Sequence, residues 1–278
     1  MMRLSILVDN MTLIDRYFLG EPGFSAFIDE DGRRVLFDLG YSGIFLDNAR
    51  RMNIDLSSLD YVCLSHGHLD HSWGLERLIR FYTEEAFEGR PVVQPSFVAH
   101  SDTLKSIIGG DAAEIGPLLS EEKLAKHFSL SLKKWPQRLS DRLVFLGGIP
   151  RVTDFEGRTA FGRKEGENSD DLVPDDSALV YSSAQGLVIV TGCAHSGICN
   201  IIEYAKEVCG EERIADIIGG FHLLHPTVQQ LEGTAEYFAR QKIERIHPCH
   251  CTGLEAKIAL SRVVKVEEAG VGLSLEYS

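Results

Sequence analysis

The sequence has no long run of apolar residues and no excess of positive charge, and both absences exclude classes of protein. No stretch of its 278 residues approaches the ~20 apolar residues that a membrane-spanning helix needs. Its 28 lysines and arginines are outnumbered by 41 aspartates and glutamates, so the net charge is −13. Because such a chain repels a phosphate backbone, we expect no nucleic acid as its partner, and the lack of an apolar run argues against a membrane.

Internal repeats, low-complexity tracts and paired C-x-x-C motifs are also missing. The N-terminal segment has one arginine, and its apolar stretch is broken by Asp9, which is typical of a first strand and not of a signal peptide. We therefore expect a cytoplasmic protein, in which the six cysteines are free thiols or ligands. The apolar content, 44%, suffices for a single domain over residues 1–278.

Strands and helices alternate along the chain, which predicts the α/β class. Residues 102–135 are polar and mixed, and we expect them to be an insertion that is helical in part. The expected helices are 43–52, 73–82, 198–208, 228–241 and 254–261. The expected strands are 4–8, 24–28, 34–38, 60–65, 92–99, 143–146, 151–155, 159–162, 177–182, 187–191, 215–219, 243–247 and 263–277, with Asp31-Gly32 as a hairpin turn.

The strongest functional signal is a cluster of histidines directly after the apolar strand at 60–65. His66, His68, Asp70 and His71 follow one another within six residues. In an extended segment His66 and His68 project to the same side, and Asp70 and His71 come where the chain turns into a helix. Imidazole and carboxylate groups suit zinc, iron or manganese. The cluster can therefore supply two ligands to each of two adjacent divalent cations.

Three more junctions between a strand and a loop carry a histidine. They contain His195, His222 and His250, each after an apolar strand. Because the carboxyl ends of parallel strands meet at one edge of a sheet, we expect these loops to converge with residues 66–71 into one ligand cage.

These motifs resemble those of the metallo-β-lactamase superfamily. The H-x-H-x-D-H pattern is similar to its signature, Phe37-Asp38-Leu39-Gly40 to its upstream D-x-G motif, and Pro248-Cys249-His250-Cys251-Thr252 to its late P-G-H-G loop, with cysteine in place of both glycines. LSHGHLDHSWGL at 64–75, TGCAHSGI at 191–198 and GGFHLL at 219–224 resemble a narrower group of metal-dependent hydrolases. That group includes the archaeal dihydropterin–ribofuranosylaminobenzene-phosphate synthase.

The resemblance implies an αββα four-layer sandwich with a dinuclear site at one edge. One ion would be held by His66, His68 and His195, and the other by Asp70, His71 and His250. Asp38 would orient a ligand histidine or the site loop. Asp70 would also accept a proton from the nucleophile.

Two residues depart from the common superfamily pattern. Cys193 takes the position of a bridging aspartate, and it is either a small buried residue, which we favour, or a thiolate ligand. His222 has no counterpart, and it is either a substitute ligand or an acid or base that faces the substrate.

The remaining candidates are expected to have structural or surface roles. An extended backbone would point Cys249 and Cys251 away from the metal ions. His100, His225 and His247 are expected to pack, and His127 to lie on the surface. We interpret Asp170, Asp171, Asp175 and Asp176 as a solvated loop, with the alternative that one of them lines the site entrance.

Three functions stay open. Because a metal pair lowers the pKa of a bound water to about 7, the leading hypothesis is hydrolysis of a small ester, lactone or phosphodiester by a metal-activated hydroxide. The second hypothesis is a pterin-condensing transferase that releases pyrophosphate. The third is a non-catalytic protein that senses a metal or a ligand. The sequence leaves the substrate and the oligomeric state open.

Overall fold

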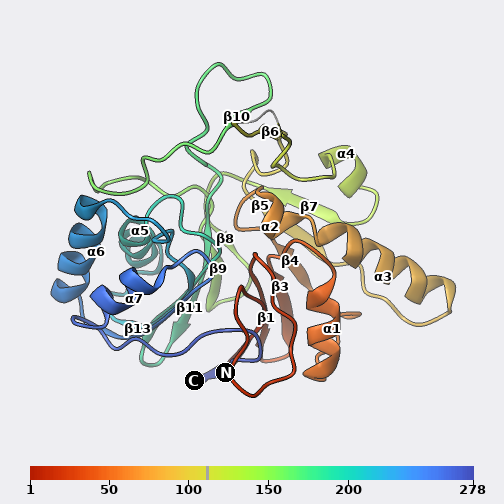
Figure 1. Cartoon of the computed structure of the whole chain (residues 1–278). Coiled ribbons are helices and arrows are strands. Elements are labelled where there is room, and N and C mark those ends of the chain that lie inside the picture. Colours follow the sequence, from red (N-terminus) through yellow and green to blue (C-terminus); the bar gives the residue numbers. More distant parts are fainter. Residues whose placement is uncertain (111–112) are drawn as a thin grey trace.

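The computed structural model describes residues 1–110 and 113–278, so residues 111–112 of the expected insertion lie outside the described part. Two sheets lie face to face (Figure 1). The first sheet contains β1 (Met2–Val8), β2 (Ser25–Glu30), β3 (Arg33–Phe37), β4 (Tyr61–Cys63), β5 (Ser96–Ala99), β7 (Ser129–Leu132) and β15 (Ser274–Tyr277), in the order β15-β1-β2-β3-β4-β5-β7.

The second sheet is built from the following half of the chain. It contains β8 (Gln137–Arg138), β9 (Leu143–Phe145), β11 (Ala178–Ser183), β12 (Gly186–Thr191), β13 (Ile214–Gly220) and β14 (Ile243–Cys249), in the order β14-β13-β12-β11-β9-β8. A separate pair, β6 (Ile107–Ile108) and β10 (Arg163–Lys164), lies above the sheets at the top of Figure 1.

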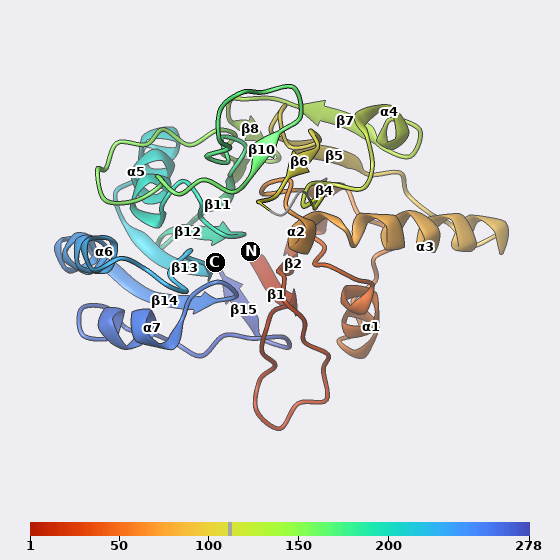
Figure 2. The same ribbon diagram turned by 45° about the horizontal axis from the view of Figure 1, so that its top comes forward.

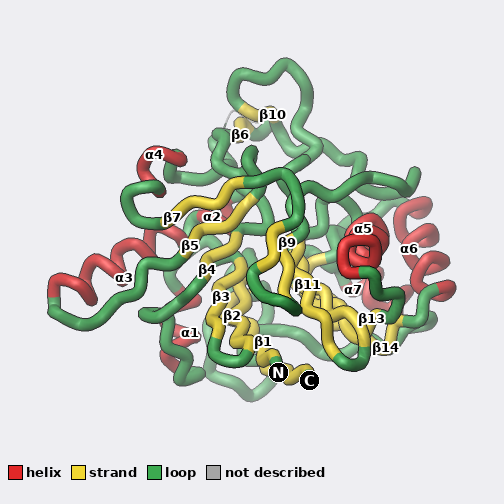
Figure 3. Tube along the Cα trace, turned by 180° about the vertical axis from the view of Figure 1, so that it is seen from behind, coloured by secondary structure: helices red, strands yellow, loops and turns green. Residues whose placement is uncertain are grey.

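Helices cover the outer face of each sheet (Figure 3). On the first sheet these are α1 (Ile44–Arg51), α3 (Leu75–Phe87) and α4 (Glu121–Leu124), with the short α2 (Leu69–Ser72) at its edge. On the second sheet they are α5 (Ile198–Cys209), α6 (Val228–Arg240) and α7 (Leu254–Leu260). None of the described helices is long and apolar enough to cross a membrane.

The apolar core has three layers, as the predicted αββα sandwich requires. Phe37 of the first sheet and Tyr181 and Val190 of the second belong to one buried cluster between the sheets. Phe45 of α1 packs on the outside of the first sheet, and Phe238 of α6 on the outside of the second. Each such side chain stabilises the fold by about 1.5–3 kcal/mol when fully buried. The predicted fold class is confirmed.

The predicted hairpin between β2 and β3 is also confirmed. Asp31 has φ +49° and Gly32 has φ +90°, and positive φ at both central residues makes the tight turn that matches strand twist. A Cβ at Gly32 would meet nothing within 4 Å. The backbone conformation, and not lack of space, therefore favours glycine here.

Parallel pairing sets the position of the site. β3, β4 and β5 are parallel neighbours, and so are β12, β13 and β14. The loops that leave β4, β12, β13 and β14 meet at one edge of the sandwich, beside α2 (Figure 2). In α/β proteins, catalytic and ligand-binding residues lie at the carboxyl ends of parallel strands such as these.

The strands expected at 151–155 and 159–162 are wrong. The N–H groups of Val152 and Thr153 donate to Oδ1 of Asn200 instead of to a neighbouring strand. Phe161 bonds back to Asp171 within the same loop. The alternating apolar residues of 151–162 therefore belong to a loop and not to a strand of either sheet.

Two other regions differ from the sequence expectation in extent. Of residues 263–277 only Ser274–Tyr277 forms a strand. Within residues 102–135, β7 pairs in parallel with β5 and so extends the first sheet. α4, in the same region, is the helical part that the sequence predicts.

Candidate metal centre

The loops at this edge bring together every histidine that the sequence analysis assigns to the cage. His66, His68, His71 and His195 are buried, and the side chain of His250 is 4% exposed. Nδ1 of His68 lies 3.1 Å from Nε2 of His195, and Nε2 of His71 lies 3.2 Å from Nε2 of His250.

The first group of potential ligands comprises His66, His68 and His195. One nitrogen of each lies within 4.8 Å of the others, and the ring of His66 is 4.7 Å from each of the other two rings. Nε2 of His66 is buried and has no hydrogen-bond partner among the described residues. Because a buried polar atom is normally satisfied, an unpartnered nitrogen aimed into this group fits a cation ligand.

The second group comprises Asp70, His71, Cys193 and His250. Sγ of Cys193 lies 3.1 Å from Nε2 of His71 and 3.1 Å from Nε2 of His250. Oδ2 of Asp70 lies 3.4 Å from Nε2 of His250. Cys193 also clusters with His195 and His222, so its sulfur lies between the two groups.

Hydrogen bonds on the far side of the rings fix which nitrogen faces the centre. Oδ2 of Asp38 accepts the Oγ–H of Ser65 (2.7 Å) and lies 2.7 Å from Nδ1 of His71. Since the Ser65 hydroxyl donates its hydrogen bond to Asp38, its oxygen accepts a hydrogen bond from Nδ1–H of His66, 2.9 Å away. Both rings then turn Nε2 toward the centre.

His250 is oriented in the same way from another loop. Its Nδ1 lies 3.0 Å from Oδ1 of Asn10, and its backbone N–H donates to Oδ1 of Asp9 at 2.7 Å. With Nδ1 donating, Nε2 carries a lone pair. Nε2 of His71 lies 3.2 Å away. Burial opposes a charge on His71, but Asp70 and Asp38 raise the pKa of that ring to about 9, so its Nε2–H points at the Nε2 lone pair of His250, and a cation bound here would displace that proton.

The backbone around the centre is strained in a way typical of functional sites. Asp38, Ala194, His222 and His250 all have φ between +48° and +60°, a region that non-glycine residues enter rarely. Gly192 lies among them, and a Cβ there would fall 2.1 Å from Oγ of Ser65. Only glycine allows this approach of the Cys193 loop to the His66 loop.

Burial and charge set the protonation of the ligand candidates. Burial lowers the pKa of His66 and His195 well below the ordinary value, and that of His68 to about 4. These rings are neutral at pH 7 and offer lone pairs. Burial opposes ionisation of Asp70, but His71 and His250 outweigh it and hold the pKa of that carboxyl well below its usual range.

Two aromatic rings cover one side of the centre. The ring of His222 lies beside that of His195, with centroids 4.4 Å apart and a tilt of 40°, and its Nδ1 is buried without a partner among the described residues. The ring of Phe161 lies 4.7 Å from His195 and 5.0 Å from His222. Sequence reasoning missed Phe161, because its segment carries no motif and reaches the centre only through the fold.

The expectation for the two late cysteines is half correct. Cys249 is buried in the core between the sheets. Sγ of Cys251 instead accepts the N–H of His222 at 3.3 Å and contacts the carbonyl oxygen of Cys193 at 3.4 Å. The strand ends at Cys249, and the positive φ of His250 breaks the alternation. This turn brings Cys251 back toward the centre.

The interpretation of the acidic run as a solvated loop is wrong for three of its four residues. Asp170 is exposed, but Asp171, Asp175 and Asp176 are buried. Oδ2 of Asp176 accepts the N–H of Ser196 at 2.8 Å, directly after His195, and burial raises the pKa of Asp176 to about 6. The apolar residues on both sides of the run, as in LVPDDSALV, are a signal that could have indicated burial.

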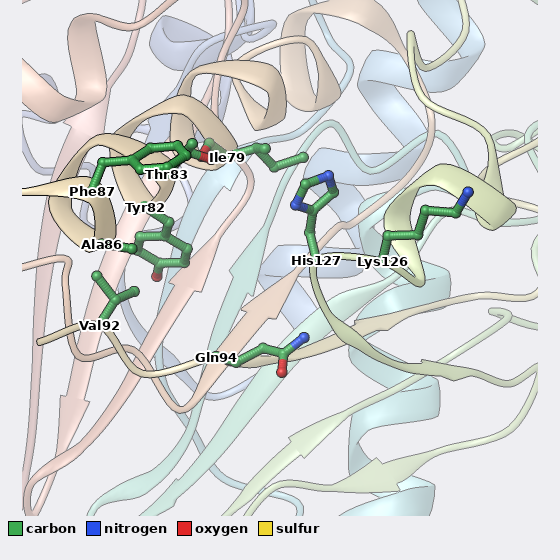
Figure 4. Close-up of a pocket in the computed structure, with 9 residues that line it drawn as sticks. All are labelled: Ile79, Tyr82, Thr83, Ala86, Phe87, Val92, Gln94, Lys126 and His127. Atoms are coloured by element: carbon green, nitrogen blue, oxygen red, sulfur yellow. The ribbon is translucent and has the colours of Figure 1, made fainter.

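The histidines outside the cage have other surroundings. His100 is buried, and its Nδ1 accepts the N–H of Asp102. His247 is buried against Asp216. His127 is exposed, as expected, and lines an apolar groove of about 480 Å³ with Tyr82 and Phe87 (Figure 4). None of the cage residues lines this groove.

Comparison with known proteins agrees with the geometry. A model of the metallo-β-lactamase superfamily matches residues 19–250. The chain belongs to this superfamily. The matched segment runs from the loop after β1 to His250 and includes both groups of potential ligands.

Relatives within the metallo-β-lactamase superfamily match almost the whole chain. An uncharacterized protein of Methanocaldococcus jannaschii, MJ0448, is 32% identical over 260 residues, 94% of each chain. The 7,8-dihydropterin-6-methyl-4-(β-D-ribofuranosyl)-aminobenzene-5'-phosphate synthase of the same organism is 29% identical over 273 residues, 90% of each chain. The crystal structure of Tm1679, described as a metal-dependent hydrolase of the β-lactamase superfamily, has a TM-score of 0.83 at 30% identity over the full length of both chains.

Proposed function

We propose that the protein is a metal-dependent hydrolase that holds two divalent cations, zinc, iron or manganese, at this edge of the sandwich. The observation that supports the proposal most strongly is the direction of the ring nitrogens. Asp38, Ser65 and Asn10 bind the outer side of the rings. The Nε2 atoms of His66, His71 and His250 are thereby turned toward the centre, where a cation can bind them.

The donor set fits two ions. His66, His68 and His195 would hold one ion, and Asp70, His71 and His250 the other, with the sulfur of Cys193 between them. Imidazole and thiolate ligands suit zinc or iron, and the carboxylate adds an oxygen ligand that manganese also accepts. When bound, such a pair lowers the pKa of water to about 7 and stabilises negative charge on a substrate oxygen.

The side chains around the metal ligands would transfer protons and exclude water. Asp70 has a side chain that is 26% exposed, so its carboxylate can take the proton that the nucleophile loses. His222 has an unpartnered Nδ1 beside His195, and this ring would exchange a proton with the leaving group. Phe161 covers both rings and would exclude bulk water from one side of the substrate.

We expect the substrate to be a small ester, lactone or phosphodiester. The test is turnover of a p-nitrophenyl ester, a γ-lactone and bis(p-nitrophenyl) phosphate by the protein loaded with each metal. We expect turnover of at least one probe and its loss in His68→Ala. His127→Ala is the control: it removes an exposed histidine outside the centre, so turnover should be retained. A fully loaded protein that turns over none of the three would favour a sensing role instead.

A specific observation keeps a second function in view. The synthase of M. jannaschii is similar over 90% of this chain, so a transferase that joins a pterin to an aminobenzene derivative on the same metal pair is the alternative. Incubation with a dihydropterin-methyl diphosphate and a ribofuranosylaminobenzene phosphate would then release pyrophosphate. Absence of pyrophosphate from the metal-loaded protein would exclude this alternative.

A further inference from the structure

A buried group of charges lies next to the centre but contains none of its ligand candidates. The side chain of Lys164 is 1% exposed and lies between Asp175, 0% exposed, and Asp171, 1% exposed. Nζ of Lys164 is 2.5 Å from Oδ1 of Asp175 and 3.7 Å from Oδ1 of Asp171. Charged side chains are fully buried only when they are paired. Lys164 precedes the loop of residues 165–170, and Asp171 and Asp175 follow it, so their ion pairs join its two ends.

One end of this group holds the ligand loop. Oδ2 of Asp175 accepts the backbone N–H of Gly67 at 3.0 Å. Gly67 stands between His66 and His68, and a Cβ on it would fall 2.4 Å from the carbonyl oxygen of Thr103. The Gly67 peptide is thus fixed between a carboxylate and a neighbouring backbone. Its orientation determines the directions in which His66 and His68 project.

The other end holds the segment that covers the centre. Lys164 belongs to β10, three residues after Phe161, and pairs with Ile107 of β6. The N–H of Phe161 donates to the carbonyl oxygen of Asp171 at 2.8 Å, and the N–H of Asp171 donates back to Gly162 at 2.9 Å. The place of the Phe161 ring over His195 therefore depends on the same three charged residues.

We infer that Lys164, Asp171 and Asp175 form a clasp, defined by these three residues, that positions the centre from two sides. Asp175 holds the Gly67 peptide in place and so fixes the spacing of His66 and His68. Lys164, through its ion pairs with Asp175 and Asp171, holds the Phe161 segment in place against the same loop. These are positioning residues that act through Gly67 and Phe161. The inference rests on the proposed metal centre.

The neighbouring residue on β10 provides a matched control. Arg163 pairs with Asp170 at 3.1 Å, and both side chains are 65% exposed. This is the same kind of ion pair, on the same short strand, without a contact to the ligand loop. Replacement of Arg163 removes a cation from β10 and leaves the clasp intact.

The test is a titration of the metal-free full-length protein with cobalt(II) under anaerobic conditions. The variants are D175A, which removes the acceptor of the Gly67 N–H, D175N, which keeps an oxygen there without the charge, K164M, and the control R163M. The affinity for the first ion and the visible cobalt spectrum are read together, and circular dichroism checks the fold. Residues that orient a ligand usually change metal affinity by about 10- to 100-fold.

We expect D175A to lose affinity by this factor with shifted cobalt bands, D175N to lose less because the oxygen remains, and K164M to lie between them. R163M should match the wild type. If the wild type binds two ions and D175A binds them with unchanged affinity and spectrum, the clasp is overturned and the proposed function stands. If the wild type binds no cobalt, the proposed function and the clasp are overturned together.

Discussion

Two buried clusters of histidine and aspartate lie at opposite ends of the second sheet, and they are built differently. The metal centre follows the ends of β12, β13 and β14. Asp216, near the start of β13, accepts hydrogen bonds from Nε of Arg245 at 2.6 Å and from the hydroxyl of Tyr277 at 2.8 Å, and lies 2.9 Å from Nδ1 of His247. In this second cluster the carboxylate of Asp216 faces three donor groups, one from each of these side chains.

The metal centre lacks that completeness. His66 has a buried Nε2 without a partner among the described residues, and the Nε2 atoms of His71 and His250 face each other. A cluster in which donors meet acceptors is stable alone, whereas ring nitrogens that crowd together without acceptors leave room for a cation in place of a proton. His247 and His250 are three residues apart, so the partner atoms, and not the residue type, distinguish a structural histidine from a ligand.

The largest effect is expected from the first ligand group. His68→Ala removes a nitrogen that no neighbour replaces, so metal binding and activity should be lost while most of the fold remains. His247→Gln should keep its metal, because its ring contacts Asp216 and not the centre. Metal analysis of both purified variants measures this difference. Unchanged metal content in His68→Ala would contradict the ligand assignment.

A change at the other cluster should reverse the pattern. Asp216→Asn leaves Arg245 beside a neutral group, and removal of one partner of a buried pair is strongly destabilising. Because the side chain of Arg245 is 34% exposed, we expect a loss of about 3 kcal/mol in the free energy of unfolding, at the lower end for such pairs. Urea unfolding in a chelator measures it. An Asp216→Asn protein that lost its metal but kept its stability would contradict the distinction between the two clusters.

The sulfur at the centre gives a spectroscopic contrast. Burial raises the pKa of the Cys193 thiol well above its ordinary value, so the sulfur becomes a ligand only if a cation displaces its proton. We expect the cobalt-loaded protein to show a sulfur-to-cobalt charge-transfer band in the near ultraviolet that Cys193→Ser abolishes. Cys209→Ser, on α5, is the control and should keep the band. Its persistence in Cys193→Ser would show that Cys193 is only a small buried residue.

The smallest effect concerns a buried carboxyl that forms no ion pair within the described part of the chain. Burial raises the pKa of Glu156 to about 7, although the N–H groups of Cys199 and Asn200 donate to it. Between about pH 4.5 and pH 7 the folded state keeps a proton that the unfolded state has released. Stability should therefore fall as the pH rises through this window, by about 3 kcal/mol at most.

The matched variant for this effect is Glu156→Gln, which cannot titrate. Urea unfolding of both proteins at pH 5 and pH 8 should show that the wild type loses more stability than the variant over this range. Two parallel pH profiles would mean that Glu156 is ionised in the folded protein throughout. The N–H groups at the start of α5 would then stabilise the carboxylate of Glu156, as its donors stabilise that of Asp216.

The parts of the fold that depend on local pattern were predictable. Asp31 and Gly32 specify their hairpin, and the ligand candidates after β4 lie within one short motif. Asn10 binds His250 from 240 positions away, and Phe161 reaches the centre from a loop without a motif, so only the folded chain reveals them. The alternation of an extended strand predicts the wrong direction for Cys251, because the positive φ of His250 ends the strand geometry there.

The measurement that tests the account most directly is the metal content of the intact protein, purified without oxygen and without a metal-affinity column. Two groups of ligands facing one another across the sulfur of Cys193 predict about two transition-metal ions per chain, as in other two-metal sites. A folded protein that holds no metal and takes up none on addition of zinc, iron or manganese would contradict the account.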